Sequence, residues 1–119
     1  MNRPTLRAVI TVLTLATAAI HLYLNFNTGS FVFQPIFTLN GLGYLALLAA
    51  FLLNLPFLAG REKLVSYVFI CYTAVTIVGY FAINGAGGFT YPLGLVTKII
   101  EVILITALWQ HLRLSEKTA

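Results

Sequence analysis

The sequence predicts an all-α integral membrane protein, a bundle of four transmembrane helices with both termini in the cytoplasm. Hydrophobic residues make up 60% of the 119 residues and charged residues only 8%, whereas an ordinary soluble domain carries roughly 25% charged residues. The mean hydropathy of +0.94 agrees. Four apolar segments are long enough to cross a hydrocarbon core of ~30 Å, so we predict one transmembrane domain covering residues 1–119.

Glycine, proline, asparagine or charged residues bound every apolar segment. Near the N-terminus, Ala16-Thr17-Ala18 imitates the cleavage site of a secretory signal, but we interpret this segment as a first transmembrane helix. Further along, Pro56 cannot donate a helical hydrogen bond and Gly60 suits a helix C-terminus, so a turn is expected there. The predicted spans cover residues 7–26, 37–58, 64–83 and 92–112.

The orientation follows from the distribution of basic residues. Loops 27–36 and 84–91 contain no lysine or arginine. If the chain crosses four times, the other side of the membrane receives Arg3, Arg7, Arg61, Lys63, Arg113 and Lys117. The positive-inside rule then places both termini and the turn at 59–63 in the cytoplasm of a multi-pass cell-membrane protein.

Each predicted helix carries a polar stripe, because residues three and four apart share one helix face. From the rise of 1.5 Å per residue, His21 lies ~21 Å beyond Arg7, whereas Lys98 and Glu101 lie ~9 Å and ~13 Å below Pro92. The stripes therefore meet in the outer half of the bilayer. The candidate ligand- or proton-binding residues are His21, Lys98, Glu101, Asn25, Asn40, Tyr44, Tyr80 and Thr97.

Two interpretations of Lys98 and Glu101 stay open, and both start from the cost of keeping ionisable groups at bilayer depth. In the first, these residues and His21 are the ionisable members of an outward-open polar cavity. In the second, Lys98 and Glu101 form an i,i+3 ion pair that neutralises both, while threonines bond to their own helix backbones. Lys98 can also extend towards the membrane surface, which would weaken the pair.

For His21 alone, the sequence favours a hydrogen-bonded residue near the membrane face over a ligand or a proton carrier. A proton-handling role requires that His21 face Glu101, because histidine titrates near neutrality and can then exchange a proton with the carboxylate.

Small residues predict close helix packing. Gly41 and Gly43 in the second segment and Gly79 in the third permit helices to approach each other, the usual means of association in lipid.

Residues that bind cofactors or perform catalysis are scarce. A bis-histidine haem is excluded within one chain, because His111 lies ~28 Å below Pro92, at the other end of the bundle from His21. The single cysteine, Cys71, excludes internal disulfides and cysteine-based metal sites. Without a catalytic triad, nucleotide loop or metal-ligand cluster, we predict no cofactor, no metal and no enzymatic activity. Scattered basic residues also argue against nucleic-acid binding.

Two stretches carry a resemblance to other proteins, Leu39-Asn-Gly-Leu-Gly-Tyr-Leu45 and Gly94-Leu-Val-Thr-Lys-Ile-Ile-Glu101. With them, most of the chain resembles a family of small, uncharacterised four-span prokaryotic membrane proteins. The resemblance implies the membrane fold and no particular activity.

The sequence therefore predicts a non-enzymatic membrane protein in contact with the lipid bilayer. We expect a small subunit of a membrane complex, or a ligand- or lipid-binding module, that associates with other membrane subunits or with copies of itself. The alternative is a proton-coupled transporter of small solutes, working as an oligomer, in which Glu101 is the titrating carboxylate.

Overall fold

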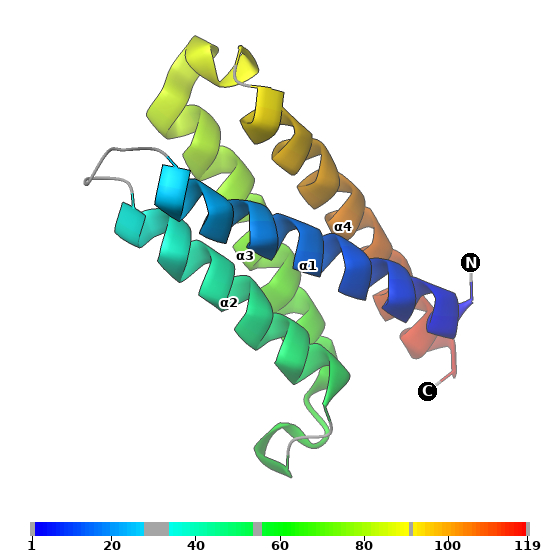
Figure 1. Cartoon of the computed structure of the whole chain (residues 1–119). Helices are drawn as coiled ribbons and strands as arrows, with labels where there is room; N and C mark the ends of the chain where they lie inside the picture. Colours follow the sequence, from blue (N-terminus) through cyan, green and yellow to red (C-terminus); the bar gives the residue numbers. More distant parts are fainter. Residues whose placement is uncertain (1, 28–33, 54–55, 91, 119) are drawn as a thin grey trace.

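Four α-helices and two short 3-10 helices form the described part of the chain (Figure 1). The computed structural model describes residues 2–27, 34–53, 56–90 and 92–118, without the side chains of 24–27, 34–37, 88 and 115–118. The prediction of an all-α fold is confirmed for these residues. The elements are α1 (Arg3–Asn27), α2 (Gln34–Leu52), η1 (Pro56–Leu58), α3 (Glu62–Asn84), η2 (Gly85–Phe89) and α4 (Pro92–Thr118).

The helix bounds differ most from the predicted spans at the C-terminal ends of α2 and α4. α2 ends at Leu52, within the apolar segment 37–58, and residues Pro56–Leu58 form the separate helix η1. Proline disfavours helical geometry at the residue before it and lacks a backbone donor, so Pro56 belongs to a new element. α4 continues to Thr118, beyond the predicted end at 112. The prediction stopped there because residues 113–118 are mostly polar, whereas helix formation does not require apolar residues.

The four long helices run in alternating directions, so that the N-terminus, the C-terminus and the turn after α2 lie at one end of the molecule (Figure 1). α1 packs against α2 and α4, and α3 packs against the same two helices. The helices thus form a closed ring around an interior. Its apolar part includes the fully buried side chains of Ile10, Phe69 and Leu104.

The glycine prediction is confirmed in α2, whereas Gly79 of α3 makes no close helix contact within the described chain. A side chain at Gly41 would meet Leu22 of α1 at 3.0 Å, and one at Gly43 would collide with the hydroxyl of Tyr72 of α3. A side chain at Gly79 would meet no atom within 4 Å.

Within the described residues, three helical stretches are long and apolar enough to cross a membrane. The stretches that meet this condition are Arg3–Tyr23, Glu62–Gly87 and Pro92–Leu114, whereas the described apolar part of α2, Thr38–Leu52, is shorter. Large apolar side chains are exposed along these helices; Val12, Val75 and Val78, for example, are 64%, 70% and 68% exposed. Such a surface is unfavourable in water and suits a membrane protein.

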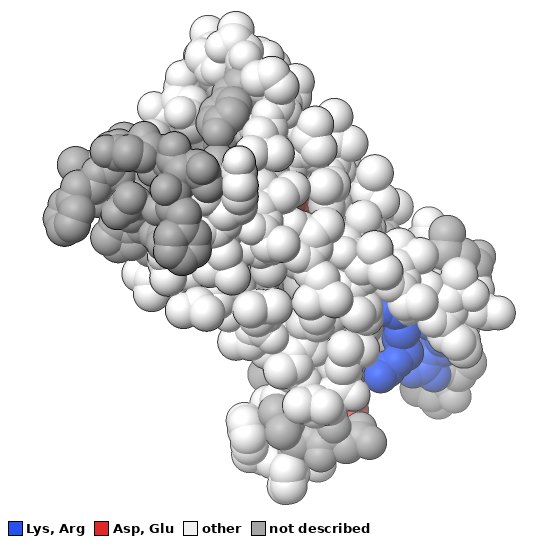
Figure 2. Space-filling view, in the orientation of Figure 1, with Lys and Arg blue, Asp and Glu red and all other residues white. Residues whose placement is uncertain are grey.

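Charged side chains gather at one end of the molecule. Figure 2 shows lysine and arginine atoms beside the chain termini, while almost all of the remaining described surface in that view carries no charge. Two charged residues lie elsewhere: Lys98 and Glu101 of α4 are buried between the helices.

Candidate functional site

The candidate site is a group of polar side chains inside the helix ring, which we call the interior cluster: Thr17, His21, Tyr44, Lys98 and Glu101. They come from α1, α2 and α4, and each is at most 6% exposed. The centre of the group is Glu101, whose exposed fraction is 0%. An ionisable carboxyl with no water contact requires partners from within the protein.

Both carboxylate oxygens of Glu101 have such partners. The ammonium of Lys98, three residues earlier on α4, forms an ion pair with Oε1. On the other oxygen, Oε2, the hydroxyl of Tyr44 donates a hydrogen bond at 2.5 Å and the hydroxyl of Thr17 donates another at 3.3 Å. Partners from α1, α2 and α4 therefore meet at one carboxylate and tie these helices together.

Lys98 points into the protein instead of extending to the membrane surface. Its side chain is 6% exposed, and its Nζ lies 5.1 Å from the ring centre of Tyr80 of α3. The face of an aromatic ring attracts a cation, and this contact is strongest where water is excluded. Tyr80 thereby links α3 to the interior cluster. A side chain at Gly94 would collide with the Tyr80 hydroxyl, so the ring lies directly against the backbone of α4.

His21 is connected to Glu101 by way of Thr17, whose hydroxyl lies between the two side chains. Its Nδ1 is 2.7 Å from the carbonyl oxygen of Thr17, one helical turn earlier, and 3.4 Å from the Thr17 hydroxyl. With a proton on Nδ1, the ring donates to that carbonyl. The His21 ring also packs at 5.9 Å, centre to centre, against Tyr44. A continuous series of polar atoms therefore runs from His21 through Thr17 to Glu101.

Asn40 and Thr97, also predicted as site residues, form hydrogen bonds away from the carboxylate. Asn40 donates to the hydroxyl of Thr76 at 3.0 Å, and its backbone carbonyl accepts from Tyr72 at 2.8 Å, which joins α2 to α3. Thr97 is buried but donates to the carbonyl of Leu93 on its own helix. The side chain of Asn25 lies outside the described residues.

The arrangement buries an ion pair between the helices and offers no metal site among the described residues. In the parts of the chain that the structure describes, no three histidine, cysteine, aspartate or glutamate residues are grouped as metal ligands. The two histidines lie in different surroundings, since His21 packs on Tyr44 and His111 packs on Phe51. Glu101 is enclosed, and access to it from the outer end stays a prediction.

Sequence reasoning missed one member of the interior cluster, Thr17, and one residue that packs against it, Tyr72. Thr17 shares a stripe with His21 at spacing i,i+4, but the sequence does not show that its hydroxyl reaches Glu101. Tyr72 packs edge-on against Tyr44, with ring centres 4.9 Å apart, and the apolar sequence around it gives no sign of this contact.

In comparisons with protein-family models, with curated proteins and with solved structures, no match to the chain was found. The class of protein that the fold and the cluster define is therefore an all-α chain with three apolar helices of membrane-spanning length and a buried ion pair.

Proposed function

We propose that this chain is a non-enzymatic, multi-pass protein of the cell membrane that works as a small subunit or binding module of a larger membrane assembly. The observation that carries the proposal is the complete occupation of the Glu101 carboxylate by Lys98, Tyr44 and Thr17. A buried carboxylate whose two oxygens both contact the protein's own side chains offers no free oxygen to a substrate, which supports a structural role for Glu101. In this proposal, partner proteins or lipids contact the outer faces of the helices.

Four membrane crossings fit the fold. α2 has 19 residues and is therefore ~28 Å long, close to the hydrocarbon thickness of ~30 Å. An even number of crossings brings both termini to the same side, in agreement with their position at one end in Figure 1. Because basic residues gather at that end, the positive-inside rule favours a cytoplasmic location for it.

Membrane residence and orientation are tested with the full chain. After washing with alkaline carbonate, an integral protein remains in the membrane pellet. A reporter that is active only in the cytoplasm should work when fused to the C-terminus and fail when inserted after Gly87. Release by carbonate, or the opposite reporter pattern, contradicts this part of the proposal.

The subunit role is tested by photo-crosslinking in native membranes. A photoreactive residue at Val75, which is 70% exposed on α3, should give a discrete protein adduct, either with another subunit or with a second copy of the chain. The same probe at Thr73, which is buried, serves as the control and should crosslink only within the chain. Purification in mild detergent that returns only monomeric chain without bound lipid, together with no adduct at Val75, contradicts the proposal.

The second candidate function is proton-coupled transport of a small solute by an oligomer. It is favoured by the series of polar atoms from His21 through Thr17 to Glu101, in which neighbouring atoms are 3.4 Å and 3.3 Å apart. The Thr17 hydroxyl therefore lies between a histidine nitrogen and a carboxylate, the two groups that such transport would protonate and deprotonate.

Proton flux distinguishes the two functions. The purified chain is reconstituted into liposomes, a proton gradient is imposed, and flux is measured for the native protein and for Glu101→Gln. The subunit role predicts that both match empty liposomes. Flux in the native protein that is lost in Glu101→Gln, and retained in Tyr67→Phe on the exposed face of α3, supports transport.

A further inference from the structure

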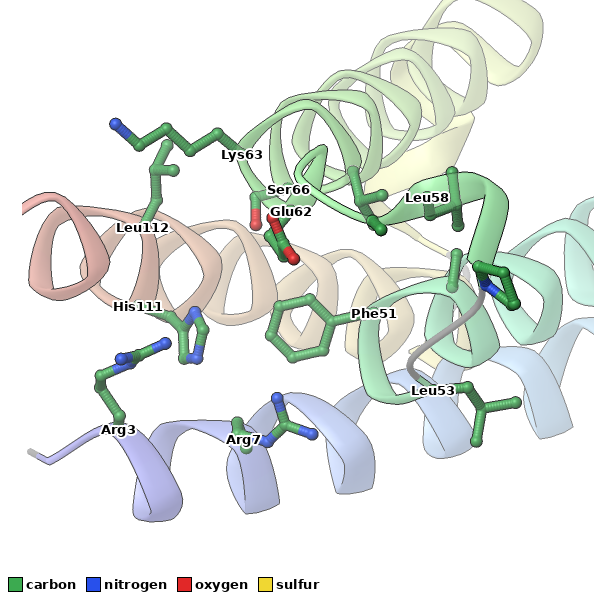
Figure 3. A pocket seen from close by; sticks show the side chains of 14 residues that line it. Arg3, Arg7, Phe51, Leu53, Leu58, Glu62, Lys63, Ser66, His111 and Leu112 are labelled. Atoms are coloured by element: carbon green, nitrogen blue, oxygen red, sulfur yellow. The ribbon is translucent and has the colours of Figure 1, made fainter. Parts of the chain in front are cut away.

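A cavity of about 370 Å³ lies at the end of the molecule that carries the chain termini. All four long helices and η1 contribute to its lining. Figure 3 shows Arg3 and Arg7 of α1 directed towards His111 of α4 and Phe51 of α2, with Glu62 of α3 on the far side. None of these residues belongs to the interior cluster.

Arg7 is held at the rim of this cavity by two contacts. One guanidinium nitrogen donates to the carbonyl oxygen of Leu52 at the end of α2, at 3.4 Å, and the guanidinium carbon lies 5.6 Å from the ring centre of Phe51. An arginine carries five N–H donors, so this one hydrogen bond leaves further donors on the guanidinium of Arg7, which lines the cavity. Such a planar donor set matches the oxygens of a phosphate group.

His111 completes this side of the cavity. Its side chain is only 6% exposed, and its ring centre lies 5.0 Å from that of Phe51 in an edge-on contact. In Figure 3 the ring lies between Phe51 and Arg3, with Arg7 nearby.

The charges that line the cavity are unbalanced. Arg3, Arg7 and Lys63 are basic, whereas Glu62 is the single acidic lining residue. Within the described residues, the one ion pair is that of Lys98 with Glu101, so Glu62 does not neutralise either arginine by direct contact. The cavity therefore presents a net positive charge to a ligand.

We propose that this cavity binds a phosphate group, supplied either by an anionic lipid headgroup or by a soluble phosphate compound, with Arg3 and Arg7 as its principal donors. Apolar residues, among them Leu53, Leu58 and Leu112, line the cavity beside the basic ones, an arrangement that suits a headgroup attached to acyl chains. Basic pockets between helix ends are a common means of binding lipid headgroups. The lipid source rests on the proposed membrane position, whereas phosphate binding itself does not.

Calorimetric titration of the full chain in an uncharged detergent tests the proposal. Three probes are compared: dioctanoyl phosphatidic acid, dioctanoylglycerol without a phosphate, and inorganic phosphate. Saturable binding of phosphatidic acid and none of dioctanoylglycerol is expected. Equal affinity for inorganic phosphate would assign the site to a soluble phosphate compound, whereas much weaker binding of inorganic phosphate would assign it to a lipid.

Variants locate the binding site. Arg7→Gln and Arg3→Gln should each raise the Kd about tenfold, the effect of losing one charge-assisted contact. Glu62→Gln should lower the Kd several-fold, because it removes the opposing charge. The matched control is Arg113→Gln, which removes an equal charge from the exposed surface of α4 outside the lining. Helicity and elution volume confirm folding; if Arg7→Gln misfolds, Arg3→Gln, at an exposed residue, carries the test.

Three results would overturn the proposal: no saturable binding of either phosphate probe, equal binding of dioctanoylglycerol, or equal weakening by Arg113→Gln and Arg7→Gln. The last result would indicate general attraction to a basic surface. Failure of phosphate binding is distinguishable from failure of the proposed function, because carbonate washing and crosslinking measure the latter without any phosphate probe.

Discussion

The hydroxyl of Tyr44 donates a 2.5 Å hydrogen bond to Glu101, a residue 57 positions away in the sequence, and both side chains are completely buried. This contact joins the middle of α2 to α4 on the opposite side of α1. Since α1 also reaches Glu101 through Thr17, three helices depend on one carboxylate for their relative positions.

Removal of the Tyr44 hydroxyl should destabilise the fold without a large change in packing. Tyr44→Phe keeps the aromatic contacts with Tyr72 and His21 but leaves Glu101 without its shortest neutral donor. We expect a loss of about 2 kcal/mol in the free energy of unfolding, the scale for a hydrogen bond to a charged group. Unfolding in mixed micelles measures the loss.

The control for Tyr44→Phe is Tyr67→Phe, which removes the same hydroxyl from a residue that is 44% exposed on α3. It should change the unfolding free energy by less than about 0.5 kcal/mol. Equal effects of the two variants would show that the hydrogen bond to Glu101 contributes nothing particular to stability.

The ion pair should show strong energetic coupling. Lys98→Met leaves the carboxylate of Glu101 buried without its cation, and a broken buried pair typically costs about 3–5 kcal/mol. Adding Glu101→Gln removes the stranded charge and keeps an oxygen that accepts from Tyr44. The double variant should therefore be more stable than Lys98→Met alone, by about 2 kcal/mol. A double-mutant cycle that is additive would contradict a structural ion pair.

Alanine at two glycines should have opposite effects. Gly43→Ala introduces a methyl group where the Tyr72 hydroxyl lies, and we expect a loss of about 1–3 kcal/mol from the forced shift of that ring. Gly79→Ala meets no atom within 4 Å and should stabilise α3 by up to about 1 kcal/mol through helix propensity. Thermal unfolding in detergent compares the two, and a destabilised Gly79→Ala would show an unexpected contact at that face.

Fluorescence quenching should report the depth of α4 in the membrane. Trp109 is the single tryptophan, is 46% exposed, and lies ~6 Å along the helix from Arg113. Lipids brominated near the headgroup should therefore quench it more than lipids brominated near the chain ends.

The matched comparison moves the tryptophan to Val102 in a Trp109→Phe background. Val102 is 53% exposed and lies ~10 Å deeper along α4, so the preference between the two brominated lipids should reverse. Strong quenching by aqueous acrylamide at Val102 would argue against a transmembrane α4.

Much of the fold was predictable because it depends on local properties of the chain. Apolar segments, Pro56 and the spacing of Lys98 and Glu101 on one helix face follow from composition and helix geometry, and the structure contains the corresponding helices and the ion pair. The end of α2 at Leu52 was less predictable, since the apolar character continues beyond the last helical residue.

The rest of the candidate site could not be predicted, because it depends on how each helix is rotated about its axis. The predicted stripes contain Asn40, Thr97 and Tyr44 alike, yet only Tyr44 of these three donates to Glu101. The cavity near Arg7 and His111 was also missed. Its lining residues come from elements far apart in the chain, and the sequence does not show which of their side chains face one another.

By itself, the sequence determined the all-α class, the apolar helices and the presence of an ionisable pair within one of them, because hydrophobicity and helical spacing act over a few turns of chain. Only the tertiary structure decided that the hydroxyls of Tyr44 and Thr17 donate hydrogen bonds to Glu101. It also decided that Arg3, Arg7 and His111 line one cavity. The physical reason is that a hydrogen bond between helices requires both donors and acceptors to point into the same small interior volume. That condition is set by the packing of all four helices together.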